Sequence, residues 1–188
     1  MQVKEGEHIV FDIKYATTDN FMHEVLYSDS TVYLHKDASK LLSEATQRLA
    51  QYNKEHNTHY KIKIWDAFRK FSIQIAMYNK VKHTPQHIYV SDPHNGEAAH
   101  TRGVAIDLTL VDKNKNELDM GTEFDNFSEK AHRDAFEQKL ITKEQENNRQ
   151  LLNFVMGKQF IGYSKEWWHY NIEMTDENKV KYPKITDL

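Results

Sequence analysis

Two short segments of the sequence carry residue types that bind metal ions and transfer protons. The first runs His100-Thr-Arg-Gly-Val-Ala-Ile-Asp107, and the second runs Glu166-Trp-Trp-His169. They supply two imidazoles and two carboxylates, each at or beside the end of an expected strand. Two histidines and one carboxylate suit Zn²⁺, and three protein ligands leave a fourth position for water, as in catalytic zinc sites. The sequence therefore predicts one zinc ion per chain, held by His100, Asp107 and His169.

The two carboxylates are expected to differ in function. Asp107 has apolar or small neighbours in its strand, and a buried carboxylate is costly unless it is paired or bound to a metal. Gly103 permits a turn between His100 and this strand. Glu166 is expected in the turn before the next strand, because positions 166 and 169 of one strand would face opposite sides. Its tryptophan neighbours are expected to desolvate Glu166 and raise its pKa toward the range useful for proton transfer.

The elements that must position these residues follow from the hydrophobic pattern. Apolar residues at helical spacing predict three helices. Their expected ranges are 37–52 with Asp37 as N-cap, 72–79, and a helix that begins at Thr142 and ends at Gly157 or Gly162. The pair Thr142 and Gln145 resembles a capping box.

Alternating apolar and polar residues predict three strands. The first leads from Ile62 to Asp66, the second spans 104–111 and the third spans 167–174. Helices that flank a few strands, without regular βαβ alternation, indicate an α+β fold. We expect a single domain over residues 1–188, with a small, mainly antiparallel sheet flanked by helices and the zinc site at the sheet.

The composition excludes several classes of function. The 188 residues include no cysteine, which excludes thiol catalysis and disulfides, and 25 basic against 28 acidic side chains give a formal charge of −3. Interleaved charge offers no basic stripe for nucleic acid, and no apolar run approaches the roughly 20 residues that span a bilayer. We therefore expect neither nucleic acid nor membrane as a partner. The polar first residues predict a cytoplasmic location if Met1 is the native start, and a periplasmic one if a signal peptide was trimmed.

The two segments resemble the zinc D-Ala-D-Ala peptidases of the VanX dipeptidase type, relatives of the VanY carboxypeptidases and of the Hedgehog zinc fold. The ligand pattern of that family is His-x6-Asp with a later Glu-x-x-His. Three further blocks resemble the family in the same order, at residues 14–21, 65–69 and 120–125. The resemblance thus covers most of the chain from about residue 11 to residue 174.

This resemblance implies the hydrolysis of D-alanyl-D-alanine to two D-alanines by a water molecule that zinc and Glu166 activate. His100, Asp107 and His169 would hold the zinc, and Glu166 would act as general base and then as general acid. Arg69 would stabilise the oxyanion of the tetrahedral intermediate. A guanidinium directed at developing charge in a dry site contributes a factor of about 10² to 10³ in rate.

The resemblance also implies how a small dipeptide substrate is held. Tyr15 and Asp125 would bind its free ammonium. Asp66, also counted among the substrate-binding residues, would orient Arg69 or its surroundings. The sequence departs from the family at three further positions, where the usual Ser, Tyr and Pro are replaced by Ala98, Phe68 and Lys70. These replacements bear on substrate affinity and on the loop around Arg69, and leave the metal ligands unchanged.

The remaining histidines are expected to contribute nothing to the site. His83 and His87 have helical spacing, but Pro85 between them breaks the helix that would bring them together. His94 is expected in a loop, and His132 is expected to be exposed to solvent.

Two other functions stay open on the sequence alone. One is a D,D-carboxypeptidase or another cell-wall peptidase that acts on longer peptide stems. The other is a zinc-containing binding domain without catalysis, a reading that the presence of both Glu166 and Arg69 disfavours. The physiological role stays open among vancomycin resistance, recycling of peptidoglycan fragments and D-alanine nutrition. The sequence also leaves open the oligomeric state and the choice of zinc over cobalt or nickel.

Overall fold

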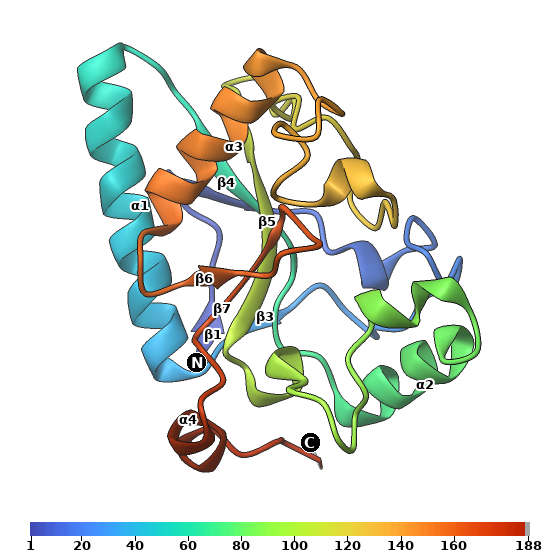
Figure 1. Cartoon of the computed structure of the whole chain (residues 1–188). Coiled ribbons are helices and arrows are strands. Elements are labelled where there is room, and N and C mark those ends of the chain that lie inside the picture. The colour runs from blue at the N-terminus through green and yellow to red at the C-terminus, as the bar shows by residue number, and fades with distance from the viewer. Residues whose placement is uncertain (187–188) are drawn as a thin grey trace.

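The computed structural model describes residues 1–186 and has an α+β fold built on one five-stranded sheet (Figure 1). The strands lie in the order β2, β4, β5, β7 and β6, with bounds Ile9–Phe11, Lys61–Asp66, Ala105–Val111, His169–Asn171 and Ile161–Gly162. Only β2 and β4 are parallel, and the other neighbours are antiparallel. A separate antiparallel pair joins β1 (Gln2–Val3) to β3 (Val32–Tyr33). The predicted fold class is therefore confirmed.

Four α-helices and four 3₁₀-helices connect these strands within residues 1–186. The α-helices are α1 (Lys36–His56), α2 (Phe71–Val81), α3 (Lys143–Met156) and α4 (Asp176–Lys181). The 3₁₀-helices are η1 (Lys14–Ala16), η2 (Pro85–Tyr89), η3 (Ala99–Arg102) and η4 (Glu129–Ala131). No helix in this range is long and apolar enough to cross a membrane.

The sheet and two helices enclose the main hydrophobic core. In Figure 1 α1 and α3 lie side by side along one side of the sheet, and α2 lies on the other side. The helical spacing of α1 buries Ala38, Leu42, Ala45 and Leu49 on one face. All seven residues of β5 are buried. A central strand covered on both faces gives a rigid base for any functional side chain that it carries.

The predicted helices are present, and one predicted cap is wrong. The capping box of α3 is confirmed, since Thr142 and Gln145 each bond the other's backbone N–H. The helix ends at Met156, with Gly157 as C-cap. Helix α1 instead begins one residue before Asp37, and its N-cap is His35, whose ring Nδ1 accepts from the Asp37 N–H.

The last predicted strand is shorter than expected. Residues 167–174 alternate in type, but only His169–Asn171 pair as β7. Trp167 and Trp168 belong instead to the turn that precedes the strand. Buried aromatic rings stabilise this turn, because Trp167 packs edge-on against Trp65 at 5.8 Å.

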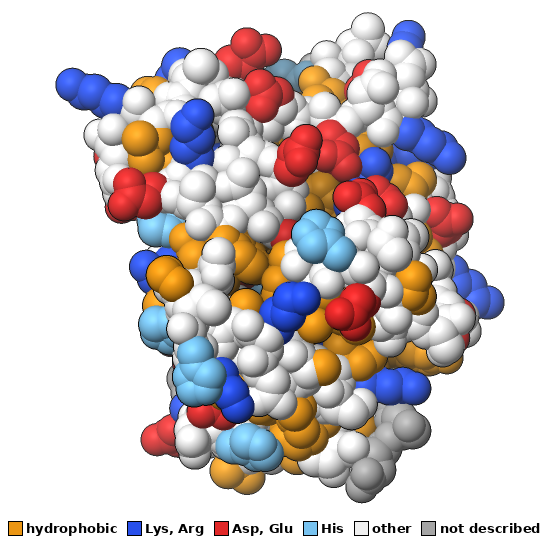
Figure 2. Space-filling view, turned by 90° about the vertical axis from the view of Figure 1, so that its right-hand side faces the viewer, with side chains coloured by type: hydrophobic (Ala, Val, Ile, Leu, Met, Phe, Trp, Pro, Cys, Tyr) orange, Lys and Arg blue, Asp and Glu red, His pale blue; other side chains and the backbone are white. Residues whose placement is uncertain are grey.

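Charged side chains of both signs are interspersed on the molecular face shown in Figure 2. This distribution agrees with the small net charge of the chain.

Candidate active site

The antiparallel register of β5 and β7 brings two of the predicted metal ligands together. Asp107 and His169 are direct cross-strand partners, so their side chains leave the sheet on the same face. The Asp107 Oδ1 atom lies 2.9 Å from His169 Nδ1. The sequence pattern could predict that each residue lies on a strand. Only the register of β5 against β7 determines that their side chains meet.

The third predicted ligand comes from the short helix η3 just before β5. Gly103 ends η3 with φ +65, and its N–H donates to the His100 carbonyl. A side chain there would adopt a strained backbone and would approach the His35 N–H at 3.1 Å. The resulting turn places His100 Nε2 3.3 Å from Asp107 Oδ2. The role expected for Gly103 is therefore confirmed.

The protonation of the two rings shows that this cluster can hold a cation. His100 Nδ1–H donates to the Ala67 carbonyl at 2.6 Å, because that carbonyl can only accept. The Asn171 amide donates to the Ile172 carbonyl, which directs Asn171 Oδ1 toward His169 Nε2 at 3.1 Å. The other ring nitrogens, His100 Nε2 and His169 Nδ1, then face each other 3.2 Å apart as bare lone pairs.

A carboxylate and two bare nitrogens that face one another repel unless a proton or a cation lies among them. Suitable ligand atoms of His100, Asp107 and His169 all lie within 4.8 Å of one another. In metal-binding histidines, the ring nitrogen that does not bind the metal usually donates its N–H to a carbonyl or carboxylate oxygen, which fixes the orientation of the ring. The donor set therefore fits a metal ion, and these three residues can hold one.

Asp107 keeps its charge despite complete enclosure. Burial would raise its pKa, but when protons rather than a metal ion occupy the nitrogens that face it, the charge of His100 and the hydrogen bonds from both histidines outweigh that effect and hold the pKa well below its usual range. An ionised carboxylate at all ordinary pH values is the form that a metal ligand requires.

Glu166 lies beside the cluster and outside the ligand set. It is in the turn before β7, as expected, where its N–H donates to the Tyr163 carbonyl. Glu166 Oε2 lies 3.9 Å from His169 Nδ1. The residue is only 8% exposed, and burial, followed by the charges of Asp107 and Asp125, raises its pKa well above the usual value. A carboxyl group with a raised pKa can both accept and donate a proton near neutral pH.

Arg69 is held by a buried carboxylate at the end of β4. A bulge at Trp65 inserts one extra residue, after which Asp66 pairs with Asp107. Asp66 Oδ2 accepts from Arg69 Nε at 3.1 Å and from Nη2 at 2.6 Å. Gln74 Oε1 accepts from Nη1 at 2.9 Å. Three guanidinium N–H groups are thus anchored, and Nη2 lies 4.0 Å from Asp107 Oδ2.

Asp66 itself is absent from the lining of the cavity at this site. It is fully buried, and its second oxygen accepts from the Tyr27 hydroxyl at 2.5 Å. Its neighbours are Arg69, Tyr27, the Ala67 N–H and, 3.6 Å from Oδ2, the Nδ1 atom of His100, which is the placement of a residue that orients Arg69.

Tyr15 and Asp125 meet at the opposite end of the site. Tyr15 lies on η1, and its hydroxyl lies 3.1 Å from Asp125 Oδ1. The Phe21 N–H donates to Asp125 Oδ2 at 3.2 Å. Burial raises the pKa of Asp125 to about 7, partly opposed by this backbone hydrogen bond.

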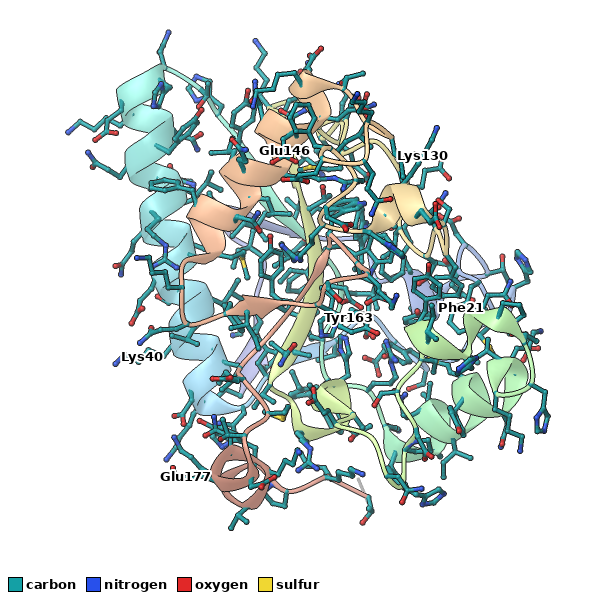
Figure 3. All side chains as sticks on the ribbon, in the orientation of Figure 1. Phe21, Lys40, Lys130, Glu146, Tyr163 and Glu177 are labelled. Carbon is teal, nitrogen blue, oxygen red and sulfur yellow. The ribbon has the colours of Figure 1, made fainter. Side chains whose placement is uncertain are left out.

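A cavity of about 340 Å³ joins these groups. Its lining includes the three possible metal ligands together with Glu166, Arg69, Tyr15 and Asp125, and it excludes Asp66. Two further lining residues, Phe21 and Tyr163, are labelled in Figure 3, where Tyr163 lies near the centre of the view and Phe21 lies to its right. A cavity of this size suits a small ligand.

The structure also places the residues that depart from the family pattern. Ala98 has φ +45, and its N–H donates to Ser91 Oγ at 3.1 Å, so a serine hydroxyl still lies beside this position. Phe68 is half-buried. Lys70 precedes α2 as its N-cap residue. Arg69 still donates to Asp66 and to Gln74, which lie before and after Lys70 in the chain.

Some residues near the site were missed or misjudged from the sequence. The buried amide of Gln74 gave no signal, because its partner Arg69 is near it only in the folded chain. Asn171 could have been found, since residues two apart in a strand share a face. His132 was expected to be exposed but is half-buried, with Nε2 3.1 Å from the Tyr89 hydroxyl. His94 lies in an exposed turn as expected.

Comparison with known proteins identifies the class of this site as that of a peptidase. Residues 3–185 match the peptidase family described as D-ala-D-ala dipeptidase. The chain is 35% identical over 177 residues to a D-alanyl-D-alanine dipeptidase of Escherichia coli (strain K12), which covers 94% of this chain and 83% of that protein. It is 28% identical over 177 residues to a D-alanyl-D-alanine dipeptidase of Enterococcus faecium, covering 85% and 84% of the two chains. The chain belongs to the D-Ala-D-Ala dipeptidase family.

Proposed function

We propose that this protein is a zinc-dependent dipeptidase that hydrolyses D-alanyl-D-alanine to two molecules of D-alanine. The observation that supports this most directly is the pairing of two ends in one small cavity. One end holds three possible metal ligands with Glu166 beside them, and the other end holds the Asp125 carboxyl with the Tyr15 hydroxyl. A free dipeptide presents an ammonium group and a scissile carbonyl at a short, fixed separation.

Zn²⁺ bound by His100, Asp107 and His169 would polarise the scissile carbonyl and lower the pKa of a water molecule. Glu166 takes the proton of the attacking water and returns it to the leaving amine. Its raised pKa suits the first step, because a more basic carboxylate accepts the proton of the water more readily.

Arg69 is placed to stabilise the negative charge that develops on the carbonyl oxygen. Asp66 and Gln74 anchor three of its five N–H groups, and its Nη2 atom also lies 4.0 Å from Asp107 Oδ2, beside the possible metal ligands. A guanidinium that is fixed before the reaction needs little reorganisation as the charge appears.

Asp125 and Tyr15 are placed to bind the substrate ammonium. A buried carboxylate gains a partner when an ammonium enters, and an acylated amine could not supply that charge. This feature favours a free dipeptide over the stem peptide of a D,D-carboxypeptidase. The complete set of acid–base and oxyanion groups favours an enzyme over a zinc-containing binding domain.

The direct test is release of D-alanine from D-Ala-D-Ala by the purified protein, before and after treatment with a chelator. We expect turnover that chelation abolishes and one equivalent of Zn²⁺ per chain restores. Turnover that persists in metal-free protein would contradict the zinc-dependent reaction. A metal-loaded protein without turnover would instead leave the binding domain as the better reading.

A further inference from the structure

One arginine outside the cavity is bound to the turn that carries Glu166 and His169. Arg133 follows η4 in a charged stretch, and no motif in the sequence connects this stretch with the site. Its Nε donates to the Tyr163 carbonyl at 3.0 Å, and its Nη2 donates to the Trp167 and His169 carbonyls at 3.0 and 2.9 Å. Three carbonyls of one seven-residue segment thus converge on a single guanidinium.

Further contacts fix this guanidinium from the other side. Its Nη1 donates to Asn153 Oδ1 at 2.7 Å, and its Cζ lies 4.5 Å from the centre of the Tyr170 ring. The backbone N–H of Arg133 donates to the Ser164 carbonyl at 2.9 Å. Arg133 therefore joins the turn to α3 and to the adjacent chain segment.

The neighbouring glycine shows how closely the guanidinium fits. A Cβ atom at Gly162 would lie 2.0 Å from Arg133 Cζ, a separation that would force the guanidinium to move. Gly162 is the last residue of β6 and precedes the turn. The absence of a side chain there lets the arginine reach the turn carbonyls.

We propose that Arg133 is a positioning residue that holds the turn of residues 163–169 in the geometry required for proton transfer by Glu166. The inference rests on the proposed function. Arg133 does not line the cavity, whereas Tyr163, Glu166 and His169 do. Its hydrogen bonds therefore reach the site through the turn, and a misplacement of about 1 Å at a reacting group can cost a factor of about 10² in rate.

The test compares Arg133→Met with Arg48→Met. Arg48 is a matched control, because it is also half-buried and donates to two backbone carbonyls, those of Val155 and Met156 at 2.7 and 2.8 Å. Those carbonyls end α3, away from the cavity. We expect Arg133→Met to lower kcat about 10- to 100-fold with KM changed less than about threefold. Arg48→Met should keep kcat within about twofold at a comparable loss of thermal stability.

A second readout is independent of activity. Amide hydrogen exchange should become faster at Glu166 and Trp167 in Arg133→Met, and should stay unchanged there in Arg48→Met. Gly162→Ala should reproduce the loss of kcat while keeping the arginine in the chain. Gly6→Ala is its control, since an added Cβ at Gly6 meets nothing within 4 Å.

The outcomes separate this inference from the proposed function. Equal kcat values in Arg133→Met and Arg48→Met, or a rise in KM alone, would overturn the positioning role while wild-type turnover still supported the dipeptidase. If the wild-type protein does not cleave D-Ala-D-Ala, the dipeptidase proposal fails, and hydrogen exchange then decides on Arg133. Unchanged exchange over residues 163–169 would overturn the inference, and faster exchange confined to them would support it.

Discussion

The two ends of the cavity are built from different kinds of structure. At the metal end, the register of β5 and β7 makes Asp107 and His169 direct partners. At the amine end, Tyr15 lies on a single 3₁₀ turn, and Asp125 lies in a loop with φ +57. Strand pairing over three residue pairs fixes the first pair, whereas the second pair is held by side-chain contacts and by the Phe21 N–H, which donates to Asp125.

The two ends also differ in charge. The pKa of Asp107 is held well below its usual range, and that of Asp125 is raised to about 7. Both carboxyls are buried, and the difference arises because Asp107 has two histidine partners while Asp125 has a hydroxyl and one N–H. The metal end is thus charged at any ordinary pH, and the amine end responds to pH near neutrality.

The largest expected effect is at the metal end. His169→Ala removes one of the three proposed ligands, so the bound metal and nearly all turnover should be lost. Metal content by atomic emission, measured beside activity, checks this. His94→Ala, in an exposed turn, should retain both. One equivalent of tightly bound metal in His169→Ala would show that the metal end is built from other residues.

Glu166→Gln should separate metal binding from proton transfer. The amide keeps the size of the side chain but cannot accept the proton, so kcat should fall by a factor of about 10² to 10⁴. One equivalent of metal should remain, because Glu166 lies outside the ligand set. A parallel loss of metal would mean that Glu166 is a ligand, and unchanged kcat would exclude it as the base.

If Asp125 at the amine end binds the substrate ammonium, KM should depend on pH. Asp125 binds an ammonium only when it is ionised, and its folded-state pKa is about 7. KM for D-Ala-D-Ala should therefore be lowest between that pH and about 8, above which the substrate amine loses its proton, and should rise about tenfold for each unit below about 7. Asp125→Asn should have a high KM that no longer follows pH in this range. A wild-type KM that stays flat from pH 8 to pH 5.5 would contradict the role of this carboxyl.

The smallest expected effect lies outside both ends. Thr142→Ala removes the side-chain half of the α3 capping box and should lower the free energy of unfolding by about 1 kcal/mol. Because α3 carries no cavity residue among those described, kcat and KM should stay at wild-type values. Denaturant unfolding measured beside steady-state kinetics checks both statements. A change in kcat would show that the cavity depends on the stability of this helix.

The same contrast explains how much could be predicted from the sequence. Periodicity predicted the helices, and the cost of burying a carboxylate singled out Asp107 as a side chain that must have a partner. The turn position of Glu166 followed from strand alternation alone. These inferences succeed because they depend on neighbours within a few residues.

Long-range convergence was beyond such reasoning. Tyr15 and Asp125 lie 110 residues apart, and only the family resemblance connected them before the structure did. The bulge at Trp65 and the amide of Gln74 depend on packing that no local pattern encodes. The N-cap of α1 was misassigned because a histidine ring occupies the place where an aspartate was expected.

The most direct test of the two-ended cavity compares kcat/KM for D-Ala-D-Ala with that for its N-acetylated form. Acetylation removes the ammonium and leaves the scissile bond unchanged. We predict that the wild-type protein prefers the free dipeptide by a factor of about 10² or more, and that Asp125→Asn loses most of this preference. Equal cleavage of both peptides by the wild-type protein would contradict the account, because the amine end would then contribute nothing to substrate recognition.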